Sequence, residues 1–162
     1  MLAPDDAAER PLPAGLLLAP LWRRLLARLV DEVPFLAVQV LGVVLLGDVR
    51  IDDEGIAVDQ PLGVVLGVVA LGVVYETVLV AWRGATLGKL LFDLVVVRAD
   101  SGRRPDRHQA ALRALVPAAL GAVPVLGPAL ALGAMSWAVW SPLRQGLHDR
   151  AAGTLVVLDP DR

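Results

Sequence analysis

The sequence contains no cysteine, which excludes disulfide bonds, thiolate catalysis and cysteine-bound metals. Its two histidines, His108 and His148, lie far apart and lack the spacing of a metal site. Lys89 is the only lysine, and the formal net charge of −2 does not give the concentrated basic face that nucleic acid requires. We therefore predict no metal, no cofactor and no nucleic-acid partner.

Groups suited to catalysis are also scarce. His148 and Asp149 could form an acid–base pair, but adjacent residues do not face the same way on regular structure, and no nucleophile accompanies them. The segment GATLGK (84–89) resembles a phosphate-binding loop, yet only three residues separate its glycines and Leu90 follows the lysine. We predict that the protein is not an enzyme.

Hydrophobic residues dominate instead, at 56% of the 162 residues, with a mean hydropathy of +0.64. The stretch 114–143 carries no charge at all. A bilayer core of roughly 30 Å is crossed by about 20 apolar residues of helix, and apolar blocks of suitable length cover 21–47, 61–82 and 110–140. These blocks predict an all-α membrane protein with about three transmembrane helices.

The charged residues predict how the helices are oriented. Residues 1–20 lack the order of a signal peptide, so we interpret them as a disordered cytoplasmic tail before a membrane domain at 21–158. Arginines precede the first block and populate 83–113, whereas the loop 48–60 is acidic. Because basic residues stay on the cytoplasmic side, we predict a multi-pass protein of the inner membrane of a bacterial cell, with its N-terminus in the cytoplasm.

The third block is interrupted by Pro124 and Pro128, and each half is short for a crossing. A single interrupted crossing and a re-entrant hairpin both fit, and we favour the first. Outside the blocks, β-branched runs at 94–98 and 155–158 are bounded by turn-forming residues. They form either a two-stranded element at the membrane surface or apolar tethers. Gly63 and Gly67 in the second block have the spacing that permits close helix packing in lipid.

Four charged residues fall at or below the membrane surface: Arg24, Arg28, Asp31 and Glu76. Pro34 frees the Val30 carbonyl beside Asp31, so a cation or proton site and an anchoring pair of Arg28 with Asp31 or Glu32 are both open. We expect Glu76 to pair with Arg24 or Arg28, or to be protonated, because an isolated carboxylate is costly in hydrocarbon. We favour an interhelical lock over a proton relay.

Three segments, RRLLARLVD (23–31), GATLGKLLFDLVVV (84–97) and GLHDRAAGTLVV (146–157), resemble in order the motifs of the RDD family of small bacterial membrane proteins. The resemblance implies that Arg24 is the family arginine, Asp31 the first aspartate and Asp149 the second. It marks the C-terminal motif residues Gly146, His148, Asp149, Gly153 and Thr154. It also marks the loop motif residues Gly84, Thr86, Gly88 and Lys89.

The resemblance implies no settled activity. We expect a membrane module that binds a partner or associates with itself. The alternative is a transporter of cations and protons, or of a small ligand, in which Asp31 and Glu76 carry the proton. Three helices are too few to enclose a path, so transport would require an oligomer. The expected partners are the lipid bilayer and either a second copy or another membrane protein.

Overall fold

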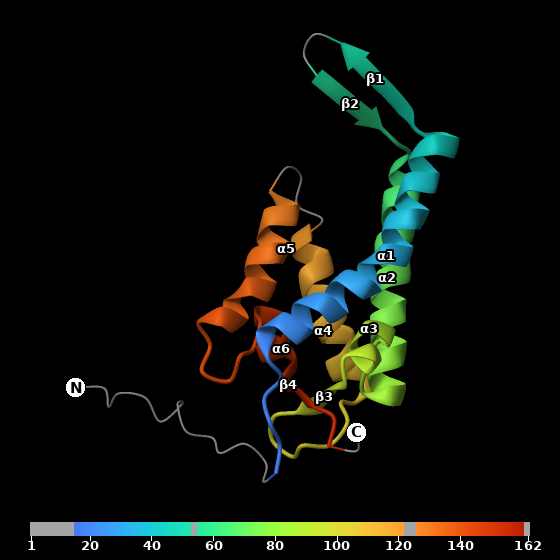
Figure 1. Cartoon of the computed structure of the whole chain (residues 1–162). Helices are drawn as coiled ribbons and strands as arrows, with labels where there is room; N and C mark the ends of the chain where they lie inside the picture. The colour runs from blue at the N-terminus through green and yellow to red at the C-terminus, as the bar shows by residue number, and fades with distance from the viewer. Residues whose placement is uncertain (1–14, 53–54, 122–125, 161–162) are drawn as a thin grey trace, which may run out of the picture.

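The computed structural model describes residues 15–52, 55–121 and 126–160 (Figure 1). Two long helices, α1 (Leu21–Leu46) and α2 (Leu62–Arg83), run antiparallel and are joined by a hairpin of β1 (Asp48–Asp52) and β2 (Gly55–Asp59). Both helices are long and apolar enough to cross a membrane, and only 6% and 11% of their most apolar windows is buried. Such exposure distinguishes them from the buried core helices of soluble proteins.

Helix α1 changes direction along its length (Figure 1). Pro34 lies inside it, and a proline within a helix removes one backbone hydrogen bond and bends the axis. Helix α2 ends at Gly84, which takes a left-handed backbone conformation (φ 76°) and donates its N–H to the carbonyl of Val80 at 2.9 Å. The predicted boundaries of both helices, 21–47 and 61–82, agree with the structure to within one residue.

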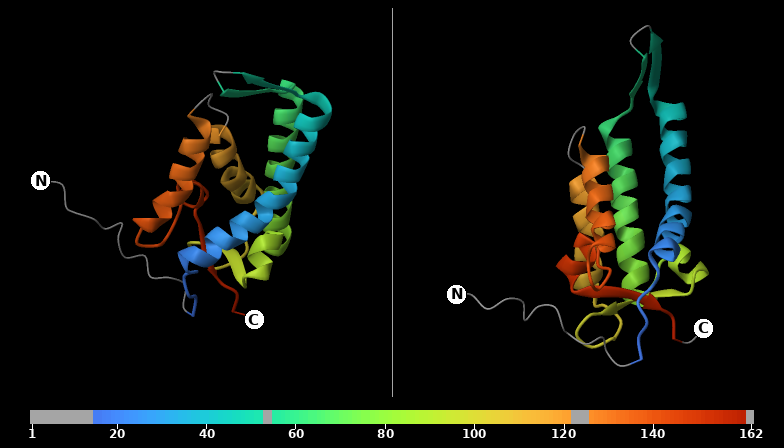
Figure 2. Two further views of the ribbon diagram at one scale, coloured as in Figure 1. Left: turned by 45° about the horizontal axis from the view of Figure 1, so that its top comes forward. Right: turned by 60° about the vertical axis from the view of Figure 1, so that its left-hand side comes forward.

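The third predicted helix is replaced by two. Helix α4 (Arg107–Gly121) and helix α5 (Gly127–Ser136) lie side by side and run in opposite directions, and a 3₁₀ turn, η1 (Trp137–Val139), follows α5 (Figure 2). At 1.5 Å per residue their 15 and 10 residues span only about 22 and 15 Å, less than a bilayer core.

Residues 110–140 therefore form two short antiparallel helices and not the single interrupted helix that we favoured, and the described residues contain two helices of membrane length, so a third transmembrane helix is not confirmed. A Cβ on Gly127 would lie 2.1 Å from the Gly121 carbonyl oxygen, so glycine is required where α5 begins close to the end of α4. Pro128 stands in the first turn of α5, where proline is tolerated. Pro124 lies outside the described residues.

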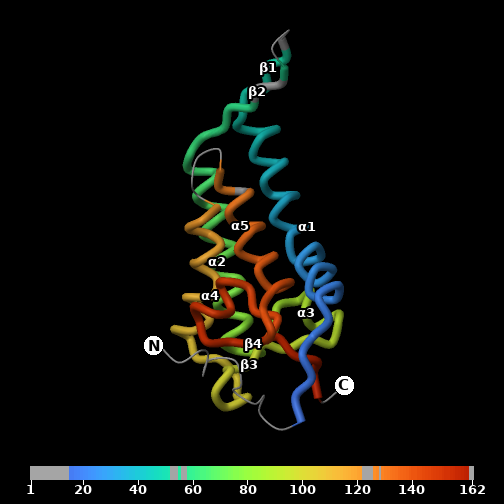
Figure 3. Tube along the Cα trace, turned by 90° about the vertical axis from the view of Figure 1, so that its left-hand side faces the viewer, coloured from blue at the N-terminus to red at the C-terminus, as the bar shows by residue number. Residues whose placement is uncertain are grey.

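A small sheet closes the end of the molecule opposite β1 and β2 (Figure 3). Strand β3 (Leu94–Arg98) pairs antiparallel with β4 (Thr154–Leu158), which confirms the predicted two-stranded element. The short helices α3 (Leu87–Leu91) and α6 (Leu147–Ala152) precede the two strands. Val80 of α2 packs with β3 and β4 in the main buried cluster, so the sheet is fixed to the helices by apolar contacts.

The end of the predicted disordered tail is ordered. Leu18 forms a β-bridge with Val157, and the N–H of Ala19 donates to the carbonyl of Val156 at 3.1 Å. Ala19 is fully buried. Residues 15–20 thus extend the sheet along the outer edge of β4, where an unpaired strand would expose its backbone groups. Residues 1–14 of the predicted tail lie outside the described residues.

Candidate functional site

The carboxylate of Asp31 binds the start of α3 from a different helix. One oxygen accepts the backbone N–H of Gly88 at 2.8 Å and the hydroxyl of Tyr75 at 2.7 Å, and the other accepts the hydroxyl of Thr86 at 2.5 Å. The Tyr75 hydroxyl also accepts the N–H of Leu87 at 3.1 Å. The first N–H groups of a helix have no partner within it, so Asp31 and Tyr75 act as its cap.

The backbones of α1 and α3 touch at Gly88. A Cβ at this position would lie 2.0 Å from the carbonyl oxygen of Ala27 and 2.9 Å from the carboxyl carbon of Asp31. Both Ala27 and Asp31 are buried, at 1% and 4% exposure. The absence of a side chain at Gly88 therefore brings its N–H within reach of the Asp31 carboxylate.

A second buried centre is the guanidinium of Arg113 on α4, which is 2% exposed. Its Nη1 donates to Glu76 of α2 at 2.6 Å, and its Nε donates to Asp149 of α6 at 2.9 Å. Its Nη2 lies 3.4 Å from Nε2 of His148. One arginine thus joins three helices through charge-assisted hydrogen bonds, which are about twice as strong as neutral ones.

Among the described residues, Glu76 is the carboxylate with the largest number of cations within 4 Å. Besides Arg113, it lies 3.4 Å from Arg28 of α1 and 3.8 Å from Lys89 of α3. The predicted pair of Glu76 with Arg28 is therefore present, and Arg28 also pairs with Glu32 at 2.6 Å. Four elements, α1 to α4, meet at this single side chain, which fits the lock that we favoured.

Arg24, the other predicted partner of Glu76, instead contacts the C-terminal residues 144–156. It donates to the carbonyl oxygens of Val156, at 2.7 Å, and of Arg144, and its Nη1 lies 3.8 Å from Asp149. Its Nε has no hydrogen-bond partner among the described residues. Arg24 therefore fastens the start of α1 to β4 and to the loop before α6.

The C-terminal motif shapes α6 around Asp149. This carboxylate accepts the N–H of Gly146 at 3.2 Å, within the first turn of the helix that it caps. A Cβ on Gly146 would lie 2.6 Å from the His148 ring, so only glycine leaves the ring its position. Gly153 ends the helix in a left-handed conformation (φ 64°), and the Thr154 hydroxyl lies 3.5 Å from Asp149.

Burial and charge shift the acidity of three groups outside the two long helices. Burial lowers the pKa of the Lys89 ammonium to about 8 and that of the His148 imidazole to about 4, which leaves His148 neutral at pH 7. For Asp149, burial favours the neutral acid, but Arg113 and the other neighbouring cations outweigh it and lower the pKa to about 2. Asp149 is accordingly a carboxylate.

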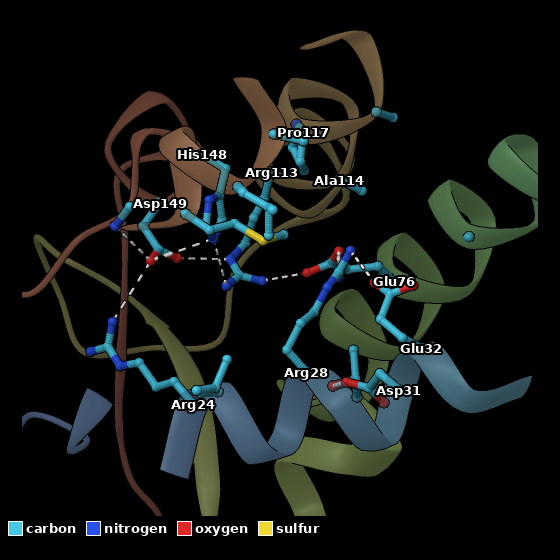
Figure 4. Close-up of a pocket in the computed structure, with 18 of the residues that line it drawn as sticks. Arg24, Arg28, Asp31, Glu32, Glu76, Arg113, Ala114, Pro117, His148 and Asp149 are labelled. Carbon is cyan, nitrogen blue, oxygen red and sulfur yellow. Dashed lines mark hydrogen bonds and ion pairs between the residues drawn. The ribbon is translucent and has the colours of Figure 1, made fainter. Parts of the chain in front are cut away.

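The charged residues described above form one end of a cavity of about 750 Å³ between the α1–α2 pair and the α4–α5 hairpin (Figure 4). The opposite end is apolar and is lined by residues such as Phe35, Val69, Val73, Pro117, Ala118 and Leu132. Among the residues predicted from the sequence, the cavity is lined by Arg24, Arg28, Asp31, Glu76, Thr86, Lys89, Gly146, His148 and Asp149. Gly84, Gly88, Gly153 and Thr154 instead shape the elements around it.

The sequence analysis did not identify Arg113 and Tyr75 as site residues. Arg113 is the only charged residue of α4 after Arg107, and an isolated charge within an apolar helix is a signal of function or pairing. Tyr75 carries no comparable signal, because its role depends on the distant Asp31. Within the described residues, no group of three His, Asp or Glu side chains is arranged to hold a metal ion.

Two exposed apolar helices of membrane length, with charged side chains turned toward an internal cavity, define a class of small helical membrane proteins. The chain belongs to the RDD family, whose family model matches residues 18–153. The match covers most of the chain, including the first two motifs in full and the third as far as Gly153. No curated protein and no solved structure matches the sequence.

Proposed function

We propose that this protein is a multi-pass inner-membrane protein, with a cytoplasmic N-terminus, that binds a small amphiphilic ligand in the cavity between α1, α2 and the α4–α5 hairpin. The observation that supports this proposal is the cavity itself. Its volume of about 750 Å³ falls within the roughly 300 to 1,000 Å³ usual for sites of small ligands. A partner helix that crosses the bilayer is much larger, so the size favours a small ligand.

The distribution of polarity supports an amphiphile. The charged end of the cavity contains Arg24, near the start of α1, and Lys89, which follows the end of α2, at the level of the predicted cytoplasmic surface. The apolar end contains Phe35 and Val69, from the middle of the two helices. A ligand with a polar head and an apolar chain would match both ends. Its head would replace water around charges that are costly to leave in hydrocarbon.

The alternative of proton transport through Asp31 and Glu76 receives less support. Asp31 accepts three hydrogen bonds, and Glu76 is in contact with three cations. In both cases the contacts hold neighbouring elements together, because Asp31 caps α3 and Glu76 joins α2 to α1, α3 and α4. We therefore assign these two residues to the assembly of the cavity wall.

The test reduces the volume of the cavity by introducing a larger side chain. Ala118 lines it, whereas the adjacent Ala119 is exposed and is absent from its lining. Protein purified in nanodiscs would be assayed by native mass spectrometry for binding of hexadecanoate, hexadecanol and hexadecyltrimethylammonium. We expect Ala118→Phe to abolish binding and Ala119→Phe to retain it. Binding that survives Ala118→Phe, or that is absent from the unmodified protein, would contradict the proposal.

Self-association is a second candidate, supported by the glycines of α2. A Cβ on Gly63 or on Gly67 would meet no atom within 4 Å, so no other described element packs against this face. Glycines at this spacing allow two helices to approach closely in lipid. If a second copy occupies the face, Gly67→Leu will convert dimers to monomers in nanodiscs, as counted by single-molecule photobleaching. Leu66→Gly, a change beside it, will leave the dimers intact.

A further inference from the structure

Charged residues of both signs line the cavity, but the carboxylates are not shared evenly among the cations. Four cations take part in the ion pairs at the charged end: Arg24, Arg28, Lys89 and Arg113. Three carboxylates pair with them: Glu32, Glu76 and Asp149. Among the described residues no basic side chain lies within ion-pair distance of Asp31, which neutral donors occupy instead. With Asp31 included, the cations and carboxylates at this end are equal in number. The cation with the weakest compensation is Arg24, because its nearest carboxylate, Asp149 at 3.8 Å, also pairs with Arg113 at 2.9 Å and because its Nε has no hydrogen-bond partner among the described residues.

Arg24 lies beside a second arginine of α1. Arg24 and Arg28 are four residues apart, on one face of the helix, and both line the cavity. Two like charges at this spacing repel each other unless an anion lies between them. Arg28 is the more accessible, with 36% of its side chain exposed, while Arg24 is 13% exposed and has neutral carbonyls as its closest acceptors.

We propose that the amphiphile has an anionic head, a carboxylate or a phosphate, which binds between Arg24 and Arg28. This inference rests on the proposed function and adds the charge of the ligand to it. Arginine is well suited to the task, because its planar guanidinium offers two parallel N–H groups to a carboxylate or phosphate. Basic pockets between membrane helices on the cytoplasmic side bind the anionic heads of lipids in the same way.

The experiment compares three ligands that share the same hydrocarbon chain and differ in the charge of the head group. Hexadecanoate, hexadecanol and hexadecyltrimethylammonium would be titrated into the full-length protein in phosphatidylcholine nanodiscs, with binding followed by native mass spectrometry. We expect hexadecanoate to bind about tenfold more tightly than hexadecanol, since one charge-assisted hydrogen bond contributes about 1.4 kcal/mol or more. The cationic amphiphile should bind more weakly than either.

Two variants change the charge of the cavity in opposite directions. Arg28→Gln should weaken hexadecanoate about tenfold, and Glu76 keeps Arg113 and Lys89 as partners in that variant. Glu32→Gln removes the half-exposed carboxylate that competes for Arg28 and should strengthen hexadecanoate about threefold. Neither change should alter hexadecanol binding by more than about twofold, since a neutral head makes no ion pair.

The possible outcomes separate the two proposals. Equal binding of all three heads, or preference for the cation, would overturn the anionic head and leave the amphiphile site intact. Loss of all three ligands from the unmodified protein would overturn the proposed function as well. Repeating the titration with phosphatidylglycerol in the nanodisc identifies the source. Displacement of hexadecanoate assigns the head to a bilayer phospholipid, and unchanged binding assigns it to a free single-chain amphiphile.

Discussion

Gly88 donates its backbone N–H to the carboxylate of Asp31, at 2.8 Å, across the contact between α3 and α1. The bond links the middle motif of the RDD family to the first. It also explains why α3, with no hydrogen bond from a capping side chain of its own, still begins where it does: its cap is supplied by a residue 57 positions earlier in the chain.

Replacing the Asp31 carboxylate with an amide should therefore destabilise the protein. Asp31→Asn removes the charge that three donors stabilise, and one loss of this kind costs about 2 kcal/mol. We expect a lower midpoint of thermal unfolding in detergent. The control is Glu32→Gln, whose half-exposed carboxylate pairs with Arg28 and with no other described cation, and its effect should stay below about 1 kcal/mol. Equal midpoints for Asp31→Asn and the unmodified protein would refute this account of the cap.

Adding one methyl group at Gly88 should be more harmful than removing the charge of Asp31. In Gly88→Ala the new Cβ would lie 2.0 Å from the Ala27 carbonyl oxygen, so α1 and α3 must separate and the cap must break. A loss of about 3 kcal/mol or more is expected. Gly133→Ala in α5 is the matched control, because its Cβ would meet no atom within 4 Å, and this change should be neutral or slightly stabilising.

Removing the charge of Glu76 should be among the most damaging single changes. Glu76→Gln leaves Arg28, Lys89 and Arg113 near one another without their shared counter-charge, and breaking a buried pair from one side costs about 3 to 5 kcal/mol. The double variant Glu76→Gln/Arg113→Gln should be less damaging than the sum of the single changes. Additive losses in the unfolding midpoint would mean that the 2.6 Å pair carries no coupling energy.

Acidification should destabilise the protein through His148. Burial lowers the pKa of this imidazole to about 4, from its ordinary 6.5, so between these values the unfolded chain binds a proton that the folded protein does not. Stability should thus fall as the pH decreases from about 6.5 to about 4, by at most about 3 kcal/mol.

The pH profile can be assigned with the two histidines. His148→Gln should flatten the decline in the unfolding midpoint between pH 6.5 and 4, since the group that resists protonation is gone. His108 is exposed at the start of α4, and His108→Gln should leave the profile unchanged. A decline that persists undiminished in His148→Gln would show that other groups cause it.

The parts of the fold that depend on local pattern were predictable. Apolar runs of fixed length located α1 and α2, and β-branched runs between turns located β3 and β4. The cost of an isolated charge predicted that Glu76 pairs with Arg24 or Arg28 or is protonated, and Arg28 is the partner that the structure shows. Each of these inferences needs only neighbouring residues and the thickness of a bilayer.

The parts that depend on distant contacts were not predictable. From the sequence, Arg113 was predicted only to flank an apolar block, because its partners Glu76 and Asp149 lie 37 and 36 positions away. The return of the chain through α5 was considered but not favoured, for a related reason. The two halves of the block have the length of neither a full crossing nor an ordinary loop, and their packing against each other decides between the alternatives.

The arrangement of cations around Glu76 has a consequence for biogenesis. Arg28 lies on the helix that emerges from the ribosome before α2, so Glu76 finds a counter-charge as soon as the first two helices share the membrane. Arg113 is synthesised later and makes the shorter contact. The nascent chain can thus pair this carboxylate before α4 is made, and the arrival of α4 adds Arg113 to the contact that Arg28 already makes.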